Sequence, residues 1–173
     1  MPSTRKIIRV FLTSAGDLQE ERKAIREVVV EFNESWANDL GYQVELIGCE
    51  ETVSRFGRPQ HLINQDVDRC DLFLGLIWKK WGTPPDHGGD YSSGFQEEFE
   101  RSMARRVKSG SPEISLFAKQ IPAEYMVDPG DDLKKVLKFR DAITADKKIL
   151  FRTSRHREIE IWKGSRENAS LRM

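Results

Sequence analysis

The chain has 173 residues, a length that suits a single domain burying about two-thirds of its unfolded surface. Its 28 basic and 28 acidic residues give a formal net charge of zero, so no overall field draws it to nucleic acid or to an anionic membrane. No apolar run approaches the roughly 20 residues of a membrane span, and the N-terminus lacks the pattern of a signal peptide. We therefore expect a cytoplasmic protein that binds locally, with neither a membrane partner nor a direct nucleic-acid partner.

Cysteine and histidine usage argues against disulfides and metal centres. Cys49 and Cys70 each lie at the edge of an apolar run, where a free thiol is typically buried, and this usage favours a reducing compartment. His61, His87 and His156 are far apart and have no cysteine or carboxylate at metal-ligand spacing. We expect no metal site.

The first predicted unit is a strand followed by a long helix. Residues 7–13 (IIRVFLT) are branched and aromatic, and the following residues 14–17 offer a turn and an N-cap. A helix then extends to Gly41, a residue suited to ending it. Its apolar positions recur at three-, four- and seven-residue steps and predict one stripe facing the sheet: Leu18, Ile25, Val29, Phe32, Trp36 and Leu40.

The remaining chain repeats this alternation, which is typical of a parallel sheet covered on both faces. Strands are predicted at 43–49, 71–78, 113–118 and 149–153. Helices are predicted at 59–67, 93–109 and 131–145. The pattern predicts an α/β flavodoxin-like three-layer sandwich with a five-stranded parallel sheet over residues 1–153, followed by a charged C-terminal helix or connector over 154–173.

Ligands of such sheets collect at the carboxyl ends of the strands, near the switch in strand order. Here that edge carries the loop TSAGD after the first strand and the loop KKWGTPPDHGGDYSSG after the third. The second loop is rich in glycine and proline, and loops of this length within compact domains are often functional.

The sequence lacks the motifs of several common classes of binding and catalytic site. The segment FLTSAGDL has neither dinucleotide-binding glycine spacing nor the Gly-Lys-Ser/Thr of a phosphate loop. No nucleophile elbow or Ser-His-Asp set is visible. A phospho-accepting receiver domain would need an aspartate at the end of the third strand, where Leu76, Ile77 and Trp78 occur instead.

One acid stands out in the helix that opens SSGFQEEFERSMARR. The buried face of this helix is defined by Phe95, Phe99 and Met103. At about 100° per residue, Glu97 points nearly opposite that face, whereas Glu98 lies on its flank on the same side as Ser102. Glu98 is thus directed to the crevice and lies in the first turn, where the helix dipole stabilises a carboxylate. The alternative is that it serves only the start of the helix.

Arg22 lies in the apolar stripe of the first helix, four residues after Leu18. A buried arginine needs a partner because an unpaired buried charge is costly. The candidates are Asp17, Asp71 and Glu98, and a purely structural ion pair is the alternative to a functional role.

Other side chains near the two loops are candidate ligand contacts. Trp81 and Tyr91 flank the long loop and either stack on a nucleobase or pack against the domain itself. Thr13, Ser14 and Asp17 supply hydroxyl groups, a carboxylate and helix-terminal amides beside the same crevice, or act only as a cap.

Three sequence blocks resemble a known family. VFLTSAGDLQEERKAI, DLFLGLIWKKWG and YSSGFQEEFERSMA, in this order, resemble the bacterial TIR-like domain family long listed as a domain of unknown function. The resemblance covers residues 7–151. That family commonly stands at the front of multidomain ATPase or repeat proteins, and it is similar in fold to Toll/interleukin-receptor domains and nucleoside deoxyribosyltransferases.

The resemblance implies that Glu98 acts on the N-glycosidic bond of NAD or a nucleoside. The transferase pattern Gly-Thr-x-x-Glu is matched by Gly94 and Glu98, while Phe95 replaces the threonine and Ser93, one place earlier, offers a substitute hydroxyl. Breaking this bond develops oxocarbenium character that a nearby carboxylate stabilises or attacks. Nicotinamide leaves without protonation because its ring nitrogen is already cationic.

The same resemblance assigns binding roles. The base would be held by Trp81, Tyr91 or Phe56. The ribose or phosphate groups would be held by Thr13, Ser14 and Asp17.

The leading hypothesis is an NAD-cleaving or related nucleotide N-glycosidase effector in antiphage defence or stress signalling. NAD would be its substrate, with no cofactor. Self-association or a fused or adjacent sensor module would control it. The alternatives are a non-catalytic adaptor that acts by assembly and a domain that binds a nucleotide second messenger without turnover.

Overall fold

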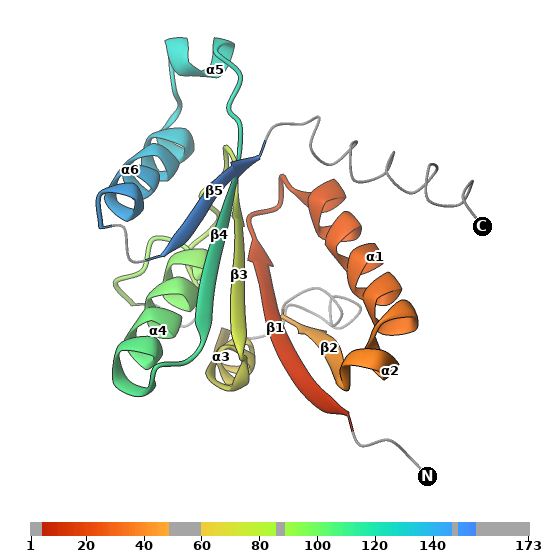
Figure 1. Ribbon diagram of the computed structural model, residues 1–173. Helices are drawn as coiled ribbons and strands as arrows, with labels where there is room; N and C mark the ends of the chain where they lie inside the picture. Colours follow the sequence, from red (N-terminus) through yellow and green to blue (C-terminus); the bar gives the residue numbers. More distant parts are fainter. Residues whose placement is uncertain (1–4, 49–59, 86–88, 147–148, 155–173) are drawn as a thin grey trace, which may run out of the picture.

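Five parallel strands form one sheet in the order β2–β1–β3–β4–β5 (Figure 1). The computed structural model describes residues 5–48, 60–85, 89–146 and 149–154. The strands are β1 (Lys6–Ser14), β2 (Tyr42–Ile47), β3 (Leu72–Ile77), β4 (Glu113–Lys119) and β5 (Leu150–Ser154). The strand order and the helices between the strands confirm the predicted α/β flavodoxin-like fold.

Helices cover both faces of this sheet. They are α1 (Gln19–Ser35), α2 (Ala37–Leu40), α3 (Gln60–Arg69), α4 (Gly94–Ser109), α5 (Glu124–Val127) and α6 (Asp131–Asp146). Figure 1 shows α1 on one side of the sheet and α4 and α6 on the other. The strand order explains this, because the chain moves from β1 outward to β2 and then back across to β3, β4 and β5. Right-handed crossovers therefore place α1 on one face and α3, α4 and α6 on the other.

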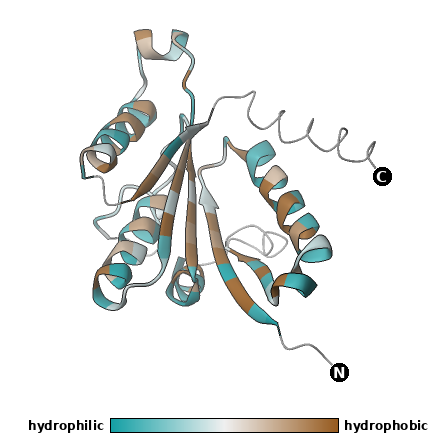
Figure 2. Ribbon diagram, viewed as in Figure 1, coloured by the Kyte–Doolittle hydropathy of each residue, from teal (hydrophilic) through white to brown (hydrophobic). Residues whose placement is uncertain are grey.

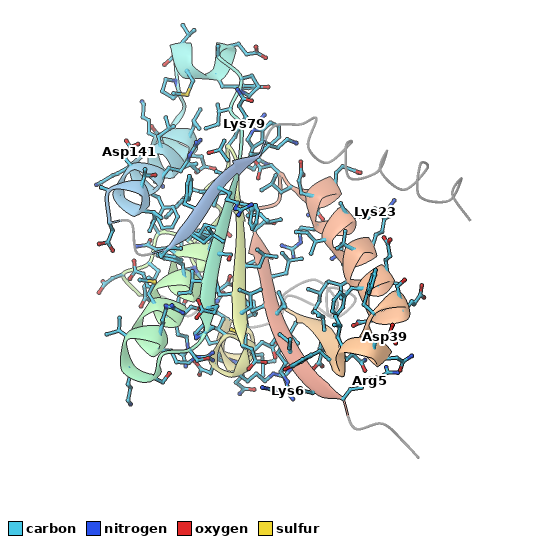
Figure 3. All side chains as sticks on the ribbon, viewed as in Figure 1. Arg5, Lys6, Lys23, Asp39, Lys79 and Asp141 are labelled. Carbon is cyan, nitrogen blue, oxygen red and sulfur yellow. The ribbon has the colours of Figure 1, made fainter. Side chains whose placement is uncertain are left out.

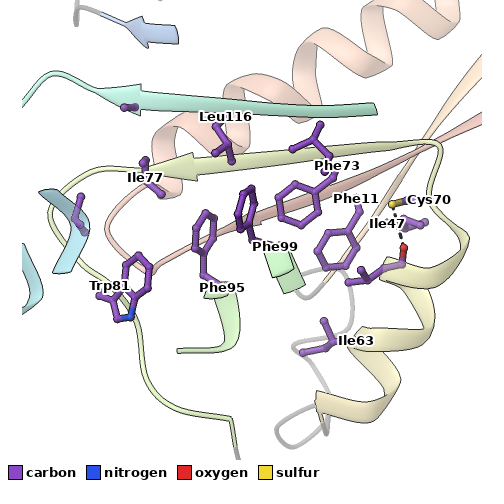
Figure 4. Close-up of a cluster of buried hydrophobic side chains, with 14 of the residues drawn as sticks. Phe11, Ile47, Ile63, Cys70, Phe73, Ile77, Trp81, Phe95, Phe99 and Leu116 are labelled. Atoms are coloured by element: carbon purple, nitrogen blue, oxygen red, sulfur yellow. Dashed lines mark hydrogen bonds between the residues drawn. The ribbon is translucent and has the colours of Figure 1, made fainter. Parts of the chain in front are cut away.

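Strand alternation divides the interior into two cores. On β3, Phe73 and Ile77 join the larger core beneath α3, α4 and α6, whereas Leu76 joins a smaller core with Leu12 and Leu18 beneath α1. Figure 2 shows hydrophobic residues concentrated on the central strands and hydrophilic residues on the outer faces of the helices. In Figure 4, aromatic rings of the larger core form a row along the sheet.

The predicted first helix is interrupted. Residue Trp36 leaves the helical conformation (φ −124°, ψ −19°), so α1 ends at Ser35 and α2 adds a single turn closed by Gly41. Trp36 and Leu40 are 58% and 53% exposed, so the prediction that both belong to the buried stripe is wrong. Gly41 does end this region, with φ 71°, as predicted.

The cysteines, the C-terminal segment and one short helix can also be compared with the prediction, as far as the described residues reach. Cys70 is buried and its Sγ donates to the carbonyl oxygen of Val67 at 3.2 Å (Figure 4). Cys49 lies outside the described residues, as do residues 155–173 of the predicted connector 154–173, whose first residue, Ser154, instead ends β5. The one-turn helix α5 was not predicted. Among the described helices, none has the length and apolar character needed to cross a membrane.

Candidate active site

Glu98 lies in the first two turns of α4 at the carboxyl end of the sheet, and it is only 4% exposed. The helix begins beside it because Ser93 acts as the N-cap, with its Oγ accepting the backbone N–H of Gln96 at 3.1 Å. The prediction that Glu98 is turned inward rather than toward solvent is therefore confirmed.

Three elements converge on the Glu98 carboxyl group. From β1, Thr13 Oγ1 donates a hydrogen bond to Glu98 Oε2 at 2.6 Å. From α3, Gln60 Nε2 donates to Glu98 Oε1 at 3.3 Å. Each carboxyl oxygen thus has one neutral donor, and both donor side chains are themselves buried.

Thr13 and Ser14 serve opposite faces of the sheet, although the sequence assigned them to one crevice. Successive strand residues point to opposite sides, so Thr13 faces α4 while Ser14 faces α1. Ser14 Oγ accepts a hydrogen bond from the Arg22 guanidinium at 2.9 Å. Arg22 is 1% exposed, so the predicted buried arginine is present and one of its contacts is this hydroxyl group.

Asp17 has a structural role that differs from the predicted cap. Leu18 occupies the N-cap position of α1, and no side chain caps that helix. Instead, Asp17 Oδ2 accepts the backbone N–H groups of Lys79 and Lys80 at 3.1 and 3.0 Å. It joins the turn after β1 to the turn after β3, which brings together the two loops that the sequence selected.

Asp71 does not belong to this site. It directly precedes β3, and its Oδ2 accepts the backbone N–H of Arg9 at 2.8 Å. Because β1 and β3 are parallel, this is the amino-terminal end of the sheet, opposite the end where Glu98 lies. Figure 3 marks the carboxyl end with Lys79, after β3, and the other end with Lys6, at the start of β1. The prediction that Asp71 supports the site is therefore wrong, since the register places it beside Arg9, four residues before the Thr13 that binds Glu98.

Burial dominates the electrostatics of Glu98. The pKa of its carboxyl group is raised from 4.5 to about 7, chiefly because burial removes water from the charged form and to a smaller extent because the charge of Glu97 lies nearby. The hydrogen bonds from Thr13 and Gln60 and the positive charge of Arg22 act in the opposite direction. The group is accordingly poised to exchange a proton near neutral pH.

Glu97 is also buried, contrary to the prediction that it points away from the protein. It is 5% exposed, and its Oε1 accepts a hydrogen bond from Asn64 Nδ2 at 2.7 Å. A helix position opposite the sheet is exposed only where no other element covers it, and here α3 packs against the flank of α4. Gln60 and Asn64 were missed, although their spacing of four residues with Ile63 and Val67 nearby was a signal of one buried, partly polar helix face.

Trp81 is part of the hydrophobic core rather than a ligand-stacking residue. It is 5% exposed, and Figure 4 shows its ring beside that of Phe95. Its ring centroid lies 5.3 Å from that of Phe139 and 6.1 Å from that of Phe95. Its Nε1 donates to Ser92 Oγ at 2.7 Å. The predicted role in holding a base is wrong because both the ring and its N–H group are already engaged within the domain.

The other candidates have mixed outcomes. Tyr91 is half-buried, Ser93 is fully buried as the helix cap, and Phe56 lies outside the described residues. Ser102 is fully buried one turn after Glu98, and its Oγ has no hydrogen-bond partner within the described part of the chain. In those same ranges, no group of three or more His, Cys, Asp and Glu side chains is arranged to hold a metal ion.

The fold and this centre define an α/β domain with a buried acid at the carboxyl edge of a parallel sheet. The chain belongs to the family described as "Domain of unknown function (DUF4062)", whose model matches residues 9–164. A comparison with curated proteins found no match.

Proposed function

We propose that this domain is a TIR-like effector that cleaves an N-glycosidic bond, with NAD as its leading candidate substrate. The Glu98 carboxyl group supports this proposal, because it is buried at the ligand-binding edge of the sheet and both of its oxygens are held by neutral donors. A carboxylate in this environment is suited to stabilising or attacking an oxocarbenium-like sugar carbon.

The remaining described candidates would hold the substrate around Glu98. Tyr91, which is half-buried, would contact the base, and the turn anchored by Asp17 would approach the ribose or phosphate groups. Arg22 would act through Glu98 by favouring its charged form. Nicotinamide needs no proton to leave NAD, so the ionised carboxyl group would be the reactive form.

The pH dependence of the reaction follows from this assignment. With the pKa of Glu98 raised to about 7, the ionised fraction increases about tenfold between pH 6 and pH 8. The rate of nicotinamide release should rise by the same factor over this interval. A rate that falls with pH would instead make the protonated form of Glu98 the reactive one.

The direct test is incubation of the purified protein with NAD at high protein concentration, with chromatographic measurement of nicotinamide and ADP-ribose. Glu98→Gln should abolish release while circular dichroism remains unchanged, and Glu100→Gln on the exposed side of the same helix should retain it. Turnover that survives in Glu98→Gln would refute the proposal. If the wild-type protein releases no nicotinamide, assembly measurements and calorimetry with cyclic nucleotides would test the adaptor and messenger-binding alternatives.

A further inference from the structure

Two buried carboxyl groups and two buried amides form a continuous chain between α3 and α4. Asn64 Nδ2 donates to Glu97 Oε1 at 2.7 Å, and Gln60 Nε2 donates both to Asn64 Oδ1 and to Glu98 Oε1 at 3.3 Å. All four side chains are less than 9% exposed. Gln60 is the residue that connects the Glu97 half of the chain to the Glu98 half.

The backbone of α4 is shaped to admit Gln60. A Cβ atom at Gly94 would lie 3.2 Å from Gln60 Oε1 and 3.9 Å from Glu98 Oε1, so a larger residue there would crowd the Gln60 side chain. Gly94 therefore permits the Gln60 amide to lie against the start of α4, directly beside Glu98. This close approach explains the glycine at this position without any requirement for positive φ.

We propose that Gln60 is a positioning residue, which fixes the Glu98 carboxyl group through its amide donor and ties that orientation to the packing of α3 against α4. The inference deepens the proposed function and rests on it for the catalytic consequence. Its physical part, the control of Glu98 by Gln60, is independent of any reaction.

The donor character of Gln60 determines the direction of its effect. An amide N–H stabilises a charged carboxylate more than a neutral carboxylic acid, so it opposes the effect of burial on Glu98. The charged groups that also act on Glu98 are Glu97 on its own helix and Arg22 on α1, whereas α3 contributes neutral amides and β1 contributes the Thr13 hydroxyl. Removing the Gln60 donor should therefore raise the pKa of Glu98.

The test is a titration of Glu98 by carbon-13 NMR of glutamate-labelled protein, with its carboxyl resonance assigned by its absence in Glu98→Gln. In Gln60→Met the midpoint should rise by about one pKa unit, a tenfold increase in proton affinity. Gln65→Met is the matched control, because Gln65 lies on the same helix with an exposed side chain. If Gln60→Met does not fold, Gln60→Leu removes the same donor without adding a titrating group and should also raise the midpoint by about one pKa unit.

A midpoint within about 0.3 unit of wild type in the Gln60 variants, or an equal shift in Gln65→Met, would overturn the inference. In the activity measurement, Gln60→Met should move the pH profile of nicotinamide release upward by the same unit and reduce kcat at neutral pH. KM for NAD should stay within about twofold, because Gln60 acts through Glu98. If the wild-type protein cleaves no NAD, the proposed function fails, yet the titration still decides whether Gln60 controls Glu98.

Discussion

Replacing Glu98 by glutamine should stabilise the protein at alkaline pH and have little effect at acid pH. The pKa of Glu98 is raised in the folded state from 4.5 to about 7, so the folded protein holds this proton more tightly than the unfolded chain does. The free energy of unfolding therefore falls as pH rises from about 4.5 to about 7, and the full penalty remains above that range. Glutamine cannot titrate and avoids the penalty.

The raised pKa of Glu98 sets the size of this effect on the free energy of unfolding. A pKa raised from 4.5 to about 7 corresponds to a penalty of about 3 kcal/mol in the free energy of unfolding, most of which develops between pH 5 and pH 8.5. Glutamine can keep both hydrogen bonds, because its Oε1 accepts from Gln60 and its Nε2 donates to the Thr13 hydroxyl, which rotates to accept. The comparison thus isolates the ionisation of Glu98 from its packing.

Urea unfolding of wild type and Glu98→Gln at several pH values measures the difference directly. Glu100→Gln provides the control, because it makes the same chemical change at an exposed position of the same helix. A stability difference between Glu98→Gln and wild type that is the same at pH 5 and pH 8.5, or a Glu98→Gln protein that is the less stable at alkaline pH, would refute a raised pKa for Glu98 in the folded protein.

Further substitutions test the packing around the site. A Cβ at Gly75 would lie 2.5 Å from a leucine side chain of β4, so Gly75→Ala should lower the free energy of unfolding, measured with urea, by about 1–3 kcal/mol. A Cβ at Gly130 would meet open space, so Gly130→Ala should leave this free energy unchanged or raise it slightly. Trp81→Ala should lower the free energy of unfolding by about 3–5 kcal/mol, whereas Trp36→Ala, at an exposed position, should lower it by less than about 0.5 kcal/mol. Equal losses would contradict the assignment of Trp81 to the hydrophobic core. Asp17→Ala should free two backbone amides at the exit of β3, and unchanged hydrogen exchange there would contradict the link between the two loops.

The sheet was predictable because its residues satisfy local rules. The run from 71 to 78 is apolar almost throughout, which fits a central strand with cores on both faces, and β3 occupies 72–77. Ser93 and Gly41 were interpretable as helix boundaries because capping depends on neighbouring residues in the sequence. Glu98 was identified from its place in a helix whose buried face the aromatic residues define.

The rest of the site depends on contacts between distant elements. Gln60 reaches Glu98 across 38 positions of the chain, and the burial of Glu97 depends on α3 covering the flank of α4. A helical-wheel projection of α4 shows neither contact, because it includes only the residues of that one helix. Asp71 was grouped with the site because its charge suits Arg22, but only the parallel register shows that it lies at the other end of the sheet. The split between Thr13 and Ser14 was available from strand alternation alone.

The central claim, that Glu98 is the reactive carboxylate of an N-glycosidase, is tested most directly by comparing nicotinamide release from NAD in Glu98→Gln and Glu97→Gln. These neighbouring glutamates are both buried and both accept amide hydrogen bonds, so each variant perturbs the same region of α4. We expect Glu98→Gln to lose about 10²–10³-fold or more in kcat, and Glu97→Gln to stay within about tenfold of wild type. Equal losses in the two variants, or full activity in Glu98→Gln, would contradict the account.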